Sequence, residues 1–570
     1  MQKYLKIKTD VLVIGGGGAA CRAAIEAYDS GVDTLTVLKG KLGSSGATTY
    51  KVAEIAGFNV PDDVADSEDN PEEYLKDILK AGLGMTDEKL ARILVEGAEE
   101  AKNNLEEWGM FFEHKKNCKY VSVTGCFSTK PRMHIIKGHG EPIINTLKKE
   151  ISKRNIKIIE STMLTDLLIR DGICIGAIGI NEETGKKIVI KAKATILATG
   201  GAGQLFKYNL NPPDITGDGH AMAYRAGAEL INMEFIQAGL GIVNPVKNIL
   251  NAWVWMTHPL LYNTKREFFL KHYLPVGLDE RMVMDEKTHY PFSSRDNSKY
   301  LEIAVHKEVK RNNGTENEVI YMDFIHVDEE KIKKLETGNT LKEMWTTTRD
   351  WLLKQGTDIR KEPLEVTIFG HALNGGLKID EKTQTTIPGL FAAGEVAGGP
   401  HGADRLGGNM MLTCQVFGKR AGEFAAEFAK ETSELKSDRD WINRAFDRLR
   451  MEGKEGRFIP KKMKAELAET MWKETLVVRN KEKLDNAAQG VKKIKENLND
   501  VKIKNIKDLI EKIEAENLLT VAELIIETAS KRKESRGSHY CEDYPETDER
   551  FNKPFTIKKG KIGPEIKSMN

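Results

Sequence analysis

A glycine-rich turn near the start of the chain has the residue types and spacing that bind a phosphate. Residues 9–31 read TDVLVIGGGGAACRAAIEAYDSG: an apolar run rich in β-branched residues, four glycines, then small and apolar residues at helical spacing. This order predicts a strand, a turn and a helix that match the G-x-G-x-x-G/A motif, whose glycines let the backbone approach a pyrophosphate. The phosphates then lie at the positive end of the helix dipole. The candidate dinucleotide-binding residues are Gly15, Gly17, Gly18, Ala19 and Ala20.

Two later glycine clusters favour FAD over NAD as the dinucleotide. The second strand, VDTLTVLK, ends at Lys39 without the acidic residue that would bind a ribose in a simple NAD site. The segment ATILATGGAG at 194–203 has the ATGG pattern that closes around FAD in two-domain flavoproteins. The segment IPGLFAAGEVAGG at 387–399 adds a tight turn and an acid placed to accept hydrogen bonds from a ribose. The added candidates are Lys39, Ala198, Thr199, Gly200, Gly201, Gly394 and Glu395.

Seven motifs, in the family's order, resemble the flavoprotein subunits of the succinate dehydrogenase and fumarate reductase family, which also includes L-aspartate oxidase. The resemblance extends over nearly the whole chain. The motifs are GGGGAA at 15–20, ATGGAG at 198–203, TGDGHAMAYRAGAELINMEFIQ at 216–237, SSRD at 293–296, GHALNGGLKID at 370–380, GLFAAGEVAGGPHGADRLGGNMML at 389–412 and RKESRGSHYCEDYPETDE at 532–549.

The resemblance implies roles for four side chains. In the resembling enzymes a hydride passes between flavin N5 and one alkene carbon, while an arginine moves a proton at the other carbon. By motif position, Arg295 corresponds to that arginine, His371 to a carboxylate-binding histidine and Arg405 to a carboxylate-clamping arginine. His401, which opens the last of these motifs, is a candidate for substrate binding. An arginine fork binds a carboxylate through two hydrogen bonds, and polarising that carboxylate helps the adjacent double bond accept a hydride.

Each of these residues also has a purely structural interpretation. Arg295 could form a surface ion pair with Asp296, His371 could be a core histidine, and Arg405 could pair with Asp404. Proton transfer by Arg295 requires a desolvated, cationic site fed by a relay of acids, because the pKa of arginine exceeds ~12 in water.

One departure from the family concerns how FAD is held. Many members attach FAD covalently to a histidine that follows the second strand, but the segment KLGSSGATTYKVAEIAG at 41–57 contains none, so we predict non-covalent FAD. The hydroxyls in this segment could contact the cofactor or cap a following helix. The remaining cofactor-binding candidates are Ser44, Ser45, Gly46, Ala47, Thr48, Asp218, Arg405, Gly408, Asn409, Met411 and Leu412.

A second departure concerns the substrate. After MEFIQ, fumarate- and succinate-handling members have a phenylalanine-histidine-proline-threonine-glycine segment and a later threonine–glutamate pair, and neither is present here. The segment NAWVWMTHPLLYN at 251–263 carries two tryptophans and His258, and Met410 stands where those members usually have a serine. The aromatic residues could reshape the pocket for a larger or less charged enoate, or form a packed lid. His258 could replace the lost histidine.

The resemblance implies an α/β fold with a Rossmann-like FAD-binding domain, an inserted α+β capping domain and a C-terminal helical domain. The resemblance implies that residues 1–240 and 361–432 form the FAD-binding domain and that 241–360 form the capping or substrate domain. Residues 433–570 form the helical domain and tail, because 437–530 have helix-period apolar positions and few glycines or prolines. A chain of 570 residues is long enough for such a multidomain protein.

Composition excludes several other classes of protein. The net charge is +1 and no long single-sign block occurs, so nucleic acid is not expected as a partner. No apolar run approaches the ~20 residues that cross a bilayer, and no secretory signal is seen, so a cytoplasmic protein is expected. The six cysteines form no CxxC pair, which argues against a disulfide framework, a metal site or an iron–sulfur cluster in this chain.

The sequence therefore predicts an FAD-dependent oxidoreductase of fumarate reductase type that acts on an α,β-unsaturated carboxylate, with fumarate as the best single substrate. Two alternatives stay open: an amino-acid oxidase resembling L-aspartate oxidase, and a subunit that only carries electrons. Electrons must come from a separate iron–sulfur subunit, a soluble carrier, a thiol-linked partner or reduced flavin. Such a partner could place the chain at a membrane surface.

Overall fold

The computed structural model describes residues 4–51, 53–115, 119–311, 313–336, 339–433 and 455–569, together with 442, 446, 448 and 449. Cys118 and the first part of the expected helical domain, at 434–441, lie outside the described residues.

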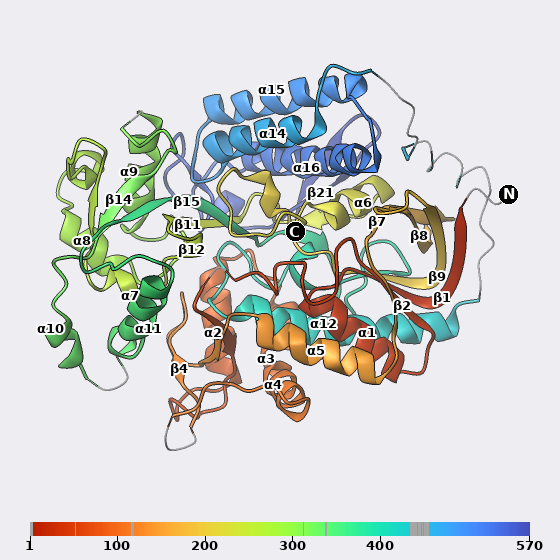
Figure 1. Cartoon of the computed structure of the whole chain (residues 1–570), viewed down its shortest axis with the longest axis horizontal. Helices are drawn as coiled ribbons and strands as arrows, with labels where there is room; N and C mark the ends of the chain where they lie inside the picture. Colours follow the sequence, from red (N-terminus) through yellow and green to blue (C-terminus); the bar gives the residue numbers. More distant parts are fainter. Residues whose placement is uncertain are drawn as a thin grey trace.

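A mostly parallel sheet forms the centre of the nucleotide-binding part (Figure 1). The second half of β1 is fully buried, as expected for a strand covered on both faces. The order of the strands is β6 (Lys157–Ile159), β2 (Thr34–Val37), β1 (Leu5–Ile14), β9 (Lys187–Leu197), β8 (Ile173–Asn181) and β7 (Thr162–Arg170), with β8 antiparallel to both of its neighbours.

Strand β17 (Leu390–Ala392) joins this sheet from a distant part of the chain. It lies parallel to the C-terminal end of β9, with Leu390 opposite Thr195 and Ala392 opposite Leu197. The nucleotide-binding part is thus assembled from two segments, and the expected α/β class is confirmed. The domain limits at 240, 360 and 432 stay a prediction.

Helices α1 (Gly18–Asp29), α12 (Asn409–Glu431) and α5 (Glu141–Lys153) cover one face of the sheet (Figure 1). Helix α12 packs closely on α1 because glycines stand at the contact. A Cβ on Gly418 would lie 2.8 Å from Ala19 O, and a Cβ on Gly422 would lie 2.4 Å from Ala23 O. The two helices that begin beside the nucleotide turn are thereby fixed relative to each other.

A smaller layer lies at one end of these helices. It contains α2 (Pro71–Gly82), α3 (Glu88–Glu96) and α4 (Ala98–Glu107), and an antiparallel sheet of β3 (Ile55–Asn59), β5 (Met133–Lys137) and β4 (Ser122–Val123). Residues 41–51 form turns that lead towards β3, so the helix that their hydroxyls were expected to cap is not formed.

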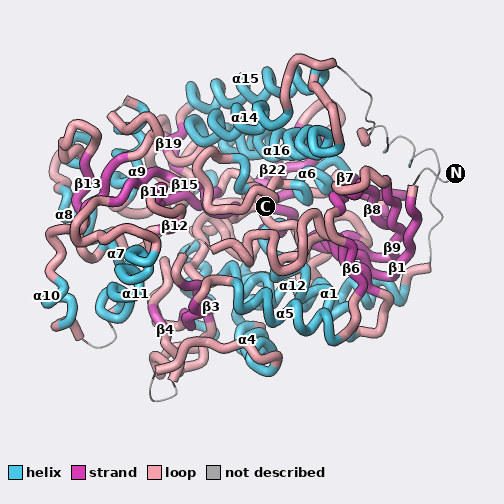
Figure 2. Tube along the Cα trace, viewed as in Figure 1, coloured by secondary structure: helices cyan, strands magenta, loops and turns pink. Residues whose placement is uncertain are grey.

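The capping part is built on an antiparallel sheet, at the left of Figure 2. One of its long strands precedes the inserted segment in the sequence and the other follows it. Helices cover this sheet and its ends. The strand order is β12 (Asn248–Ile249), β11 (Ile236–Asn244), β15 (Leu364–Leu373), β14 (Ile320–Asp323) and β13 (Leu260–Tyr262), and the helices are α7 (Ala252–Trp255), α8 (Glu280–Glu286), α9 (Lys299–Lys310), α10 (Glu329–Lys333) and α11 (Thr340–Lys354).

The C-terminal region packs α14 (Pro460–Thr475), α15 (Lys481–Asn497) and α16 (Ile506–Lys531) together on the opposite side from α12 (Figures 1 and 2). The indole of Trp472 donates to Ile368 O at 2.8 Å and so ties α14 to the capping sheet. A further sheet joins the C-terminal tail to the nucleotide-binding part, in the order β18 (Ala397–Gly398), β16 (Gly376–Lys378), β10 (Leu230–Ile231), β21 (Phe555–Lys559) and β22 (Pro564–Ser568). The short strands β19 (Val478–Arg479) and β20 (Tyr540–Cys541) form a separate pair.

Candidate active site

A long cavity opens at the carboxyl ends of β1, β2, β9 and β17, where open α/β sheets bind ligands. The predicted cofactor residues that line it are Gly15, Gly17, Gly18, Ala19, Lys39, Ser45, Gly46, Ala47, Thr48, Ala198, Thr199, Gly200, Asp218, Gly394, Glu395, Arg405, Gly408 and Met411. Those that do not line it are Ala20, Ser44, Gly201, Asn409 and Leu412. Most of the latter pack behind the wall, and Asn409 accepts hydrogen bonds from Asn59 and Tyr74 there.

The first glycine turn leaves room for phosphates at the start of α1. Gly15 has φ +132°, and a Cβ there would lie 2.1 Å from Ala198 O, so only glycine fits between these strands. No side chain caps α1 at Gly17, while Gly18 N donates to Thr48 Oγ1 at 3.1 Å. Free N–H groups at a helix start are suited to bind a pyrophosphate.

Lys39 and Asp218 form an ion pair at one end of the cavity. Lys39 Nζ lies 2.9 Å from Asp218 Oδ2 and 3.1 Å from Glu514 Oε1, and it also donates to Thr216 Oγ1. Burial alone would lower the pKa of Lys39, but the two carboxylates outweigh burial and raise it. The lysine charge at this end is therefore balanced within the protein.

Glu395 lines the cavity directly after the turn at Gly394. Its Oε1 accepts the N–H of Leu373 at 3.0 Å. Burial raises the pKa of Glu395 to about 7, although this hydrogen bond and the charge of Arg405 act in the opposite direction. The carboxyl group can therefore accept hydrogen bonds from a hydroxylated ligand, which fits the ribose contact predicted for it.

Arg405 is a buried cation in the cavity wall without an acidic partner among the described residues. It is 7% exposed, and its guanidinium donates to Gln237 Oε1 at 3.0 Å and Leu406 O at 2.9 Å. The expected alternative, an ion pair with Asp404, is not formed because Asp404 binds Arg295 instead. Burial lowers the pKa of Arg405. An anionic ligand would balance this charge.

His371 lies beside Arg405 and also lines the cavity. Its Nε2 is 3.5 Å from Arg405 Nη2, its ring meets the ring of Tyr290 edge-on at 5.6 Å, and its Nδ1 has no hydrogen-bond partner. Burial, followed by the charges of Arg405 and His139, lowers the pKa of His371 to about 3. His371 is therefore a neutral imidazole that can hydrogen-bond a ligand.

Arg295 does not line the cavity. Its Nη2 lies 2.7 Å from Asp404 Oδ2 and 2.8 Å from Ala81 O, and its guanidinium lies 4.4 Å from the centre of the Phe127 ring. Asp296 pairs with His289 at 3.1 Å rather than with Arg295. Arg295 is thus connected to the cavity wall only indirectly: it pairs with Asp404, the residue that precedes Arg405 in the chain.

Neither His401 nor His258 is among the cavity-lining residues. His401 is 3% exposed, its Nε2 is 3.4 Å from Thr413 Oγ1, and burial lowers its pKa to about 3. His258 follows α7, with its Nε2 2.9 Å from Asp285 Oδ1 on a partly exposed surface. The structure therefore brings together only His371 and Arg405 of the five predicted reaction and substrate residues.

The cavity is also lined by side chains outside the predicted site residues, including one of the two tryptophans noted in the sequence. Trp253 lines it while donating to Thr348 Oγ1 at 2.9 Å, whereas Trp255 is fully buried in the core. Cys126, Tyr290 and His139 are further lining residues. His139 could have been suspected from its place in a Gly-His-Gly turn, but Cys126 and Tyr290 carry no comparable signal.

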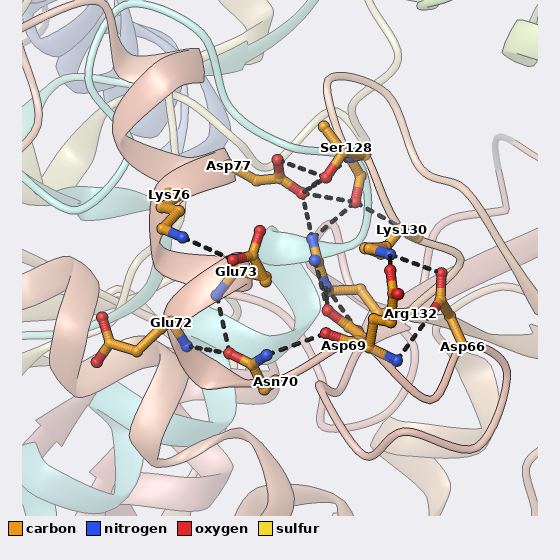
Figure 3. A network of polar contacts seen from close by, with 12 residues as sticks. Asp66, Asp69, Asn70, Glu72, Glu73, Lys76, Asp77, Ser128, Lys130 and Arg132 are labelled. Atoms are coloured by element: carbon orange, nitrogen blue, oxygen red, sulfur yellow. Dashed lines mark hydrogen bonds and ion pairs between the residues drawn. The ribbon is translucent and has the colours of Figure 1, made fainter.

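An ion-pair network holds the segment that brings Cys126 to the cavity (Figure 3). Arg132 is fully buried, and its guanidinium binds Asp69 at 2.6 Å and also binds Asp77 at the middle of α2. The same guanidinium lies 4.8 Å from the centre of the Tyr74 ring, whose hydroxyl donates to Asn409 Oδ1 at the start of α12. The network therefore links the segment at 122–132 to a cavity-forming helix.

Comparison with known proteins shows which family the chain belongs to. A family profile described as "FAD binding domain" matches residues 10–411, and one described as "Fumarate reductase flavoprotein C-term" matches residues 464–567. The chain belongs to the succinate dehydrogenase and fumarate reductase flavoprotein family. The flavoprotein is thus an FAD-dependent oxidoreductase, as its motifs predicted.

Three relatives illustrate the range of this family. One subunit of the fumarate reductase (CoM/CoB) of Methanothermobacter marburgensis is 35% identical, with 98% of each chain covered. The L-aspartate oxidase of Pseudomonas aeruginosa is 30% identical, covering 94% of this chain and 96% of that one. The structure of Mycobacterium smegmatis Sdh1 in complex with UQ1 is 29% identical with a TM-score of 0.83, covering 99% of this chain and 94% of that one.

Buried polar atoms without partners fit FAD in the cavity. Thr199 Oγ1 and His139 Nδ1 are buried without hydrogen-bond partners, and both residues line the cavity. A polar ligand could satisfy such atoms, which are costly when left unpaired. Among the described residues, no helix has the length and apolar character needed to span a bilayer.

Proposed function

We propose that this flavoprotein interconverts an α,β-unsaturated carboxylate and its saturated form, with fumarate as the first substrate to test. FAD, when bound, supplies the group that accepts or donates the hydride. The observation that carries the proposal is Arg405, a buried cation in the wall of the FAD cavity whose contacts are all neutral. A carboxylate would neutralise this charge and accept hydrogen bonds from the remaining N–H groups of the guanidinium.

The neighbours of Arg405 would help it to hold the carboxylate of the substrate. His371 would hydrogen-bond the carboxylate as a neutral ring, and Gln237 holds the guanidinium in place. Concentrating positive charge at the carboxylate withdraws electrons from the adjacent double bond, which favours hydride addition. Proton transfer by Arg295 remains part of the proposal, and it requires the guanidinium, which pairs with Asp404 outside the cavity lining, to reach the substrate.

The cavity gives one clear anchor for a carboxylate rather than two. Among the described lining residues, Lys39 is balanced by Asp218 and Glu514, whereas Arg405 has no acidic partner. Trp253 and Met410 supply apolar surface in the same cavity. The substrate range should therefore include enoates with a single carboxylate as well as fumarate.

A viologen-coupled assay tests the proposal. The purified holoenzyme is mixed anaerobically with reduced viologen and then with fumarate, monomethyl fumarate or crotonate. Enoate-dependent oxidation of the viologen supports the proposal. No oxidation with any of these enoates, from protein with a full complement of FAD, would leave only an electron-carrying role.

The relative named L-aspartate oxidase motivates a second candidate. An oxidase of this kind would also bind a carboxylate at Arg405, but it would form an imine and hydrogen peroxide from an amino acid in air. Peroxide release with L-aspartate, measured beside the viologen assay, separates the two. We propose further that electrons reach the flavin from a separate subunit or carrier, because no cysteine pair in the sequence suits a cluster and the Methanothermobacter relative is itself one subunit of its enzyme.

A further inference from the structure

Cys126 places a thiol in the cavity close to the residue that would anchor the substrate. Its Sγ accepts the backbone N–H of Tyr290 at 3.2 Å, and its carbonyl accepts the N–H of Gly407 at 3.0 Å. Cys126, Tyr290, Gly407 and Arg405 all line the cavity. The Tyr290 ring in turn contacts His371, so the thiol belongs to the same group of side chains as the proposed carboxylate site.

A second observation, independent of the thiol, indicates what kind of molecule reaches it. Arg405 is only 7% exposed, and its positive charge faces the cavity without forming an ion pair with any carboxylate of the described residues, although Glu395 acts on it from a longer distance. An anionic molecule is drawn to such a charge. A carboxylate held there would bring its remaining atoms into the part of the cavity that Cys126 lines.

Three of the other described cysteines lack this combination: Cys21 and Cys174 are fully buried in the core, and Cys541 is buried in the C-terminal tail. Cys414 also lines the cavity and is also affected by the charge of Arg405, but burial raises its pKa to about 12. It lies beside the nucleotide turn, where a Cβ on Gly394 would be 3.6 Å from its Sγ. FAD would cover Cys414 there and leave Cys126 as the cavity thiol beside the substrate.

We propose that Cys126 is a covalent modification site for electrophiles that carry a carboxylate, with Arg405 holding that carboxylate. The inference rests on the proposed function because it uses the same anchor. With an α,β-unsaturated carboxylate, Sγ bonds to the β-carbon, the π electrons move to the α-carbon, and that carbon takes the thiol proton. With iodoacetate, Sγ bonds to carbon as the carbon–iodine bond breaks, and iodide and a proton leave.

The surroundings of Cys126 also control how fast it reacts. Burial raises the pKa of the thiol, although the Tyr290 N–H and the charge of Arg405 act in the opposite direction. The thiolate is the reactive form, so modification is slow at neutral pH and becomes faster as pH rises. This keeps the thiol intact during turnover while leaving it open to a strong electrophile. Modification would then block the substrate end of the cavity.

Charge-matched alkylating reagents test the inference. The holoenzyme is treated separately with iodoacetate and iodoacetamide, and Cys126 is followed by peptide mass spectrometry beside a free cysteine peptide. We expect the ratio of iodoacetate to iodoacetamide labelling at Cys126 to exceed that of the peptide on the order of tenfold. Succinate should protect Cys126, and Cys126→Ser should remove the label without changing the bound-flavin spectrum.

Two results would overturn the inference: no labelling of Cys126 by either reagent, or a reagent ratio equal to that of the free peptide. Arg405→Gln should lower the ratio to the peptide value. If that variant loses FAD, succinate protection of the wild-type protein still tests the anchor. Viologen oxidation by fumarate without labelling contradicts only this inference, whereas carboxylate-selective labelling without turnover of any enoate contradicts only the proposed function.

Discussion

At the residue scale, the central feature is a buried guanidinium whose charge is left for a ligand. Burying a charge without a partner is costly, so natural proteins keep such charges mainly where they are used. The contacts of Arg405 with Gln237, Leu406 and His371 are all to neutral groups and orient it without neutralising it. Arg405 differs in this respect from a structural arginine such as Arg132, whose charge is balanced by ion pairs with two aspartates.

Arg405→Lys should lower kcat/KM for fumarate by about 10²- to 10³-fold, because a lysine cannot reproduce the forked hydrogen bonds to a carboxylate. The matched control is Arg420→Lys on the following helix, α12, where the guanidinium donates to Glu381 O away from the cavity. Viologen-coupled kinetics at equal flavin content measure both variants. A loss no larger for Arg405→Lys than for Arg420→Lys would remove Arg405 from the proposed site.

FAD should be released when the holoenzyme is precipitated with acid. The cavity segment Ser45, Gly46, Ala47 and Thr48 offers no histidine, cysteine or tyrosine for attachment. We expect a colourless pellet and all FAD in the supernatant. A yellow pellet would show a covalent bond, and a flavin-bearing peptide containing His139 would identify that cavity-lining histidine as the attachment site.

Sequence reasoning singled out His371 and Arg405, which the structure places in one cavity, because each belongs to a motif beside a glycine turn. It could not predict which side chains form ion pairs with each other. An ion pair between Arg405 and Asp404 was left open as an alternative, but consecutive side chains point in different directions, and Asp404 pairs with Arg295 from the capping part. His258 was expected near the substrate from residue type alone, and the fold instead places it against Asp285.

At the element scale, the segment at 122–132 depends on its ties to α2 (Figure 3). Arg132→Met should destabilise the protein by about 3–5 kcal/mol, because it leaves Asp69 and Asp77 as buried charges without their cation. Lys76→Ala on α2 removes an exposed pair with Glu73 and should have no measurable effect. Urea titrations compare them, and equal effects would show that the buried network does not stabilise this segment.

Helix α6 (Asp218–Ala226) carries a buried histidine that should make stability fall in mild acid. His220 is fully buried with both ring nitrogens unpaired, and burial lowers its pKa to about 4 despite the charge of Asp218. The unfolded chain binds this proton near pH 6.5, so the contribution of His220 is complete above that pH and is lost as pH falls towards 4. The slope reaches about 1.4 kcal/mol per pH unit.

His220→Met should therefore flatten the acid side of the stability profile. The unfolding temperature of the variant, measured from about pH 7.5 to about pH 5, should fall less steeply than that of the wild type. Parallel profiles would mean that His220 does not titrate on unfolding. Other buried histidines contribute equally to both proteins, so the difference between profiles isolates His220.

At the scale of the whole molecule, the cavity depends on contacts between distant parts of the chain. Strand β17 completes the sheet beside β9, and glycines bring α12 against α1. Local patterns predicted the strand and helix on either side of the first glycine turn, because hydrophobic periodicity and glycine turns are local. They could not give the pairing of β11 with β15, nor the tail strand β21 beside β10, because these pairings join segments far apart in the sequence.

The most direct test of the central claim is a single turnover. The bound flavin is fully reduced with dithionite, excess reductant is removed, and fumarate is added in a stopped-flow instrument under anaerobic conditions. We predict that the oxidised flavin spectrum returns and that succinate forms in an amount equal to the flavin oxidised. Flavin that stays reduced with fumarate, monomethyl fumarate and crotonate alike would contradict an enoate site at Arg405.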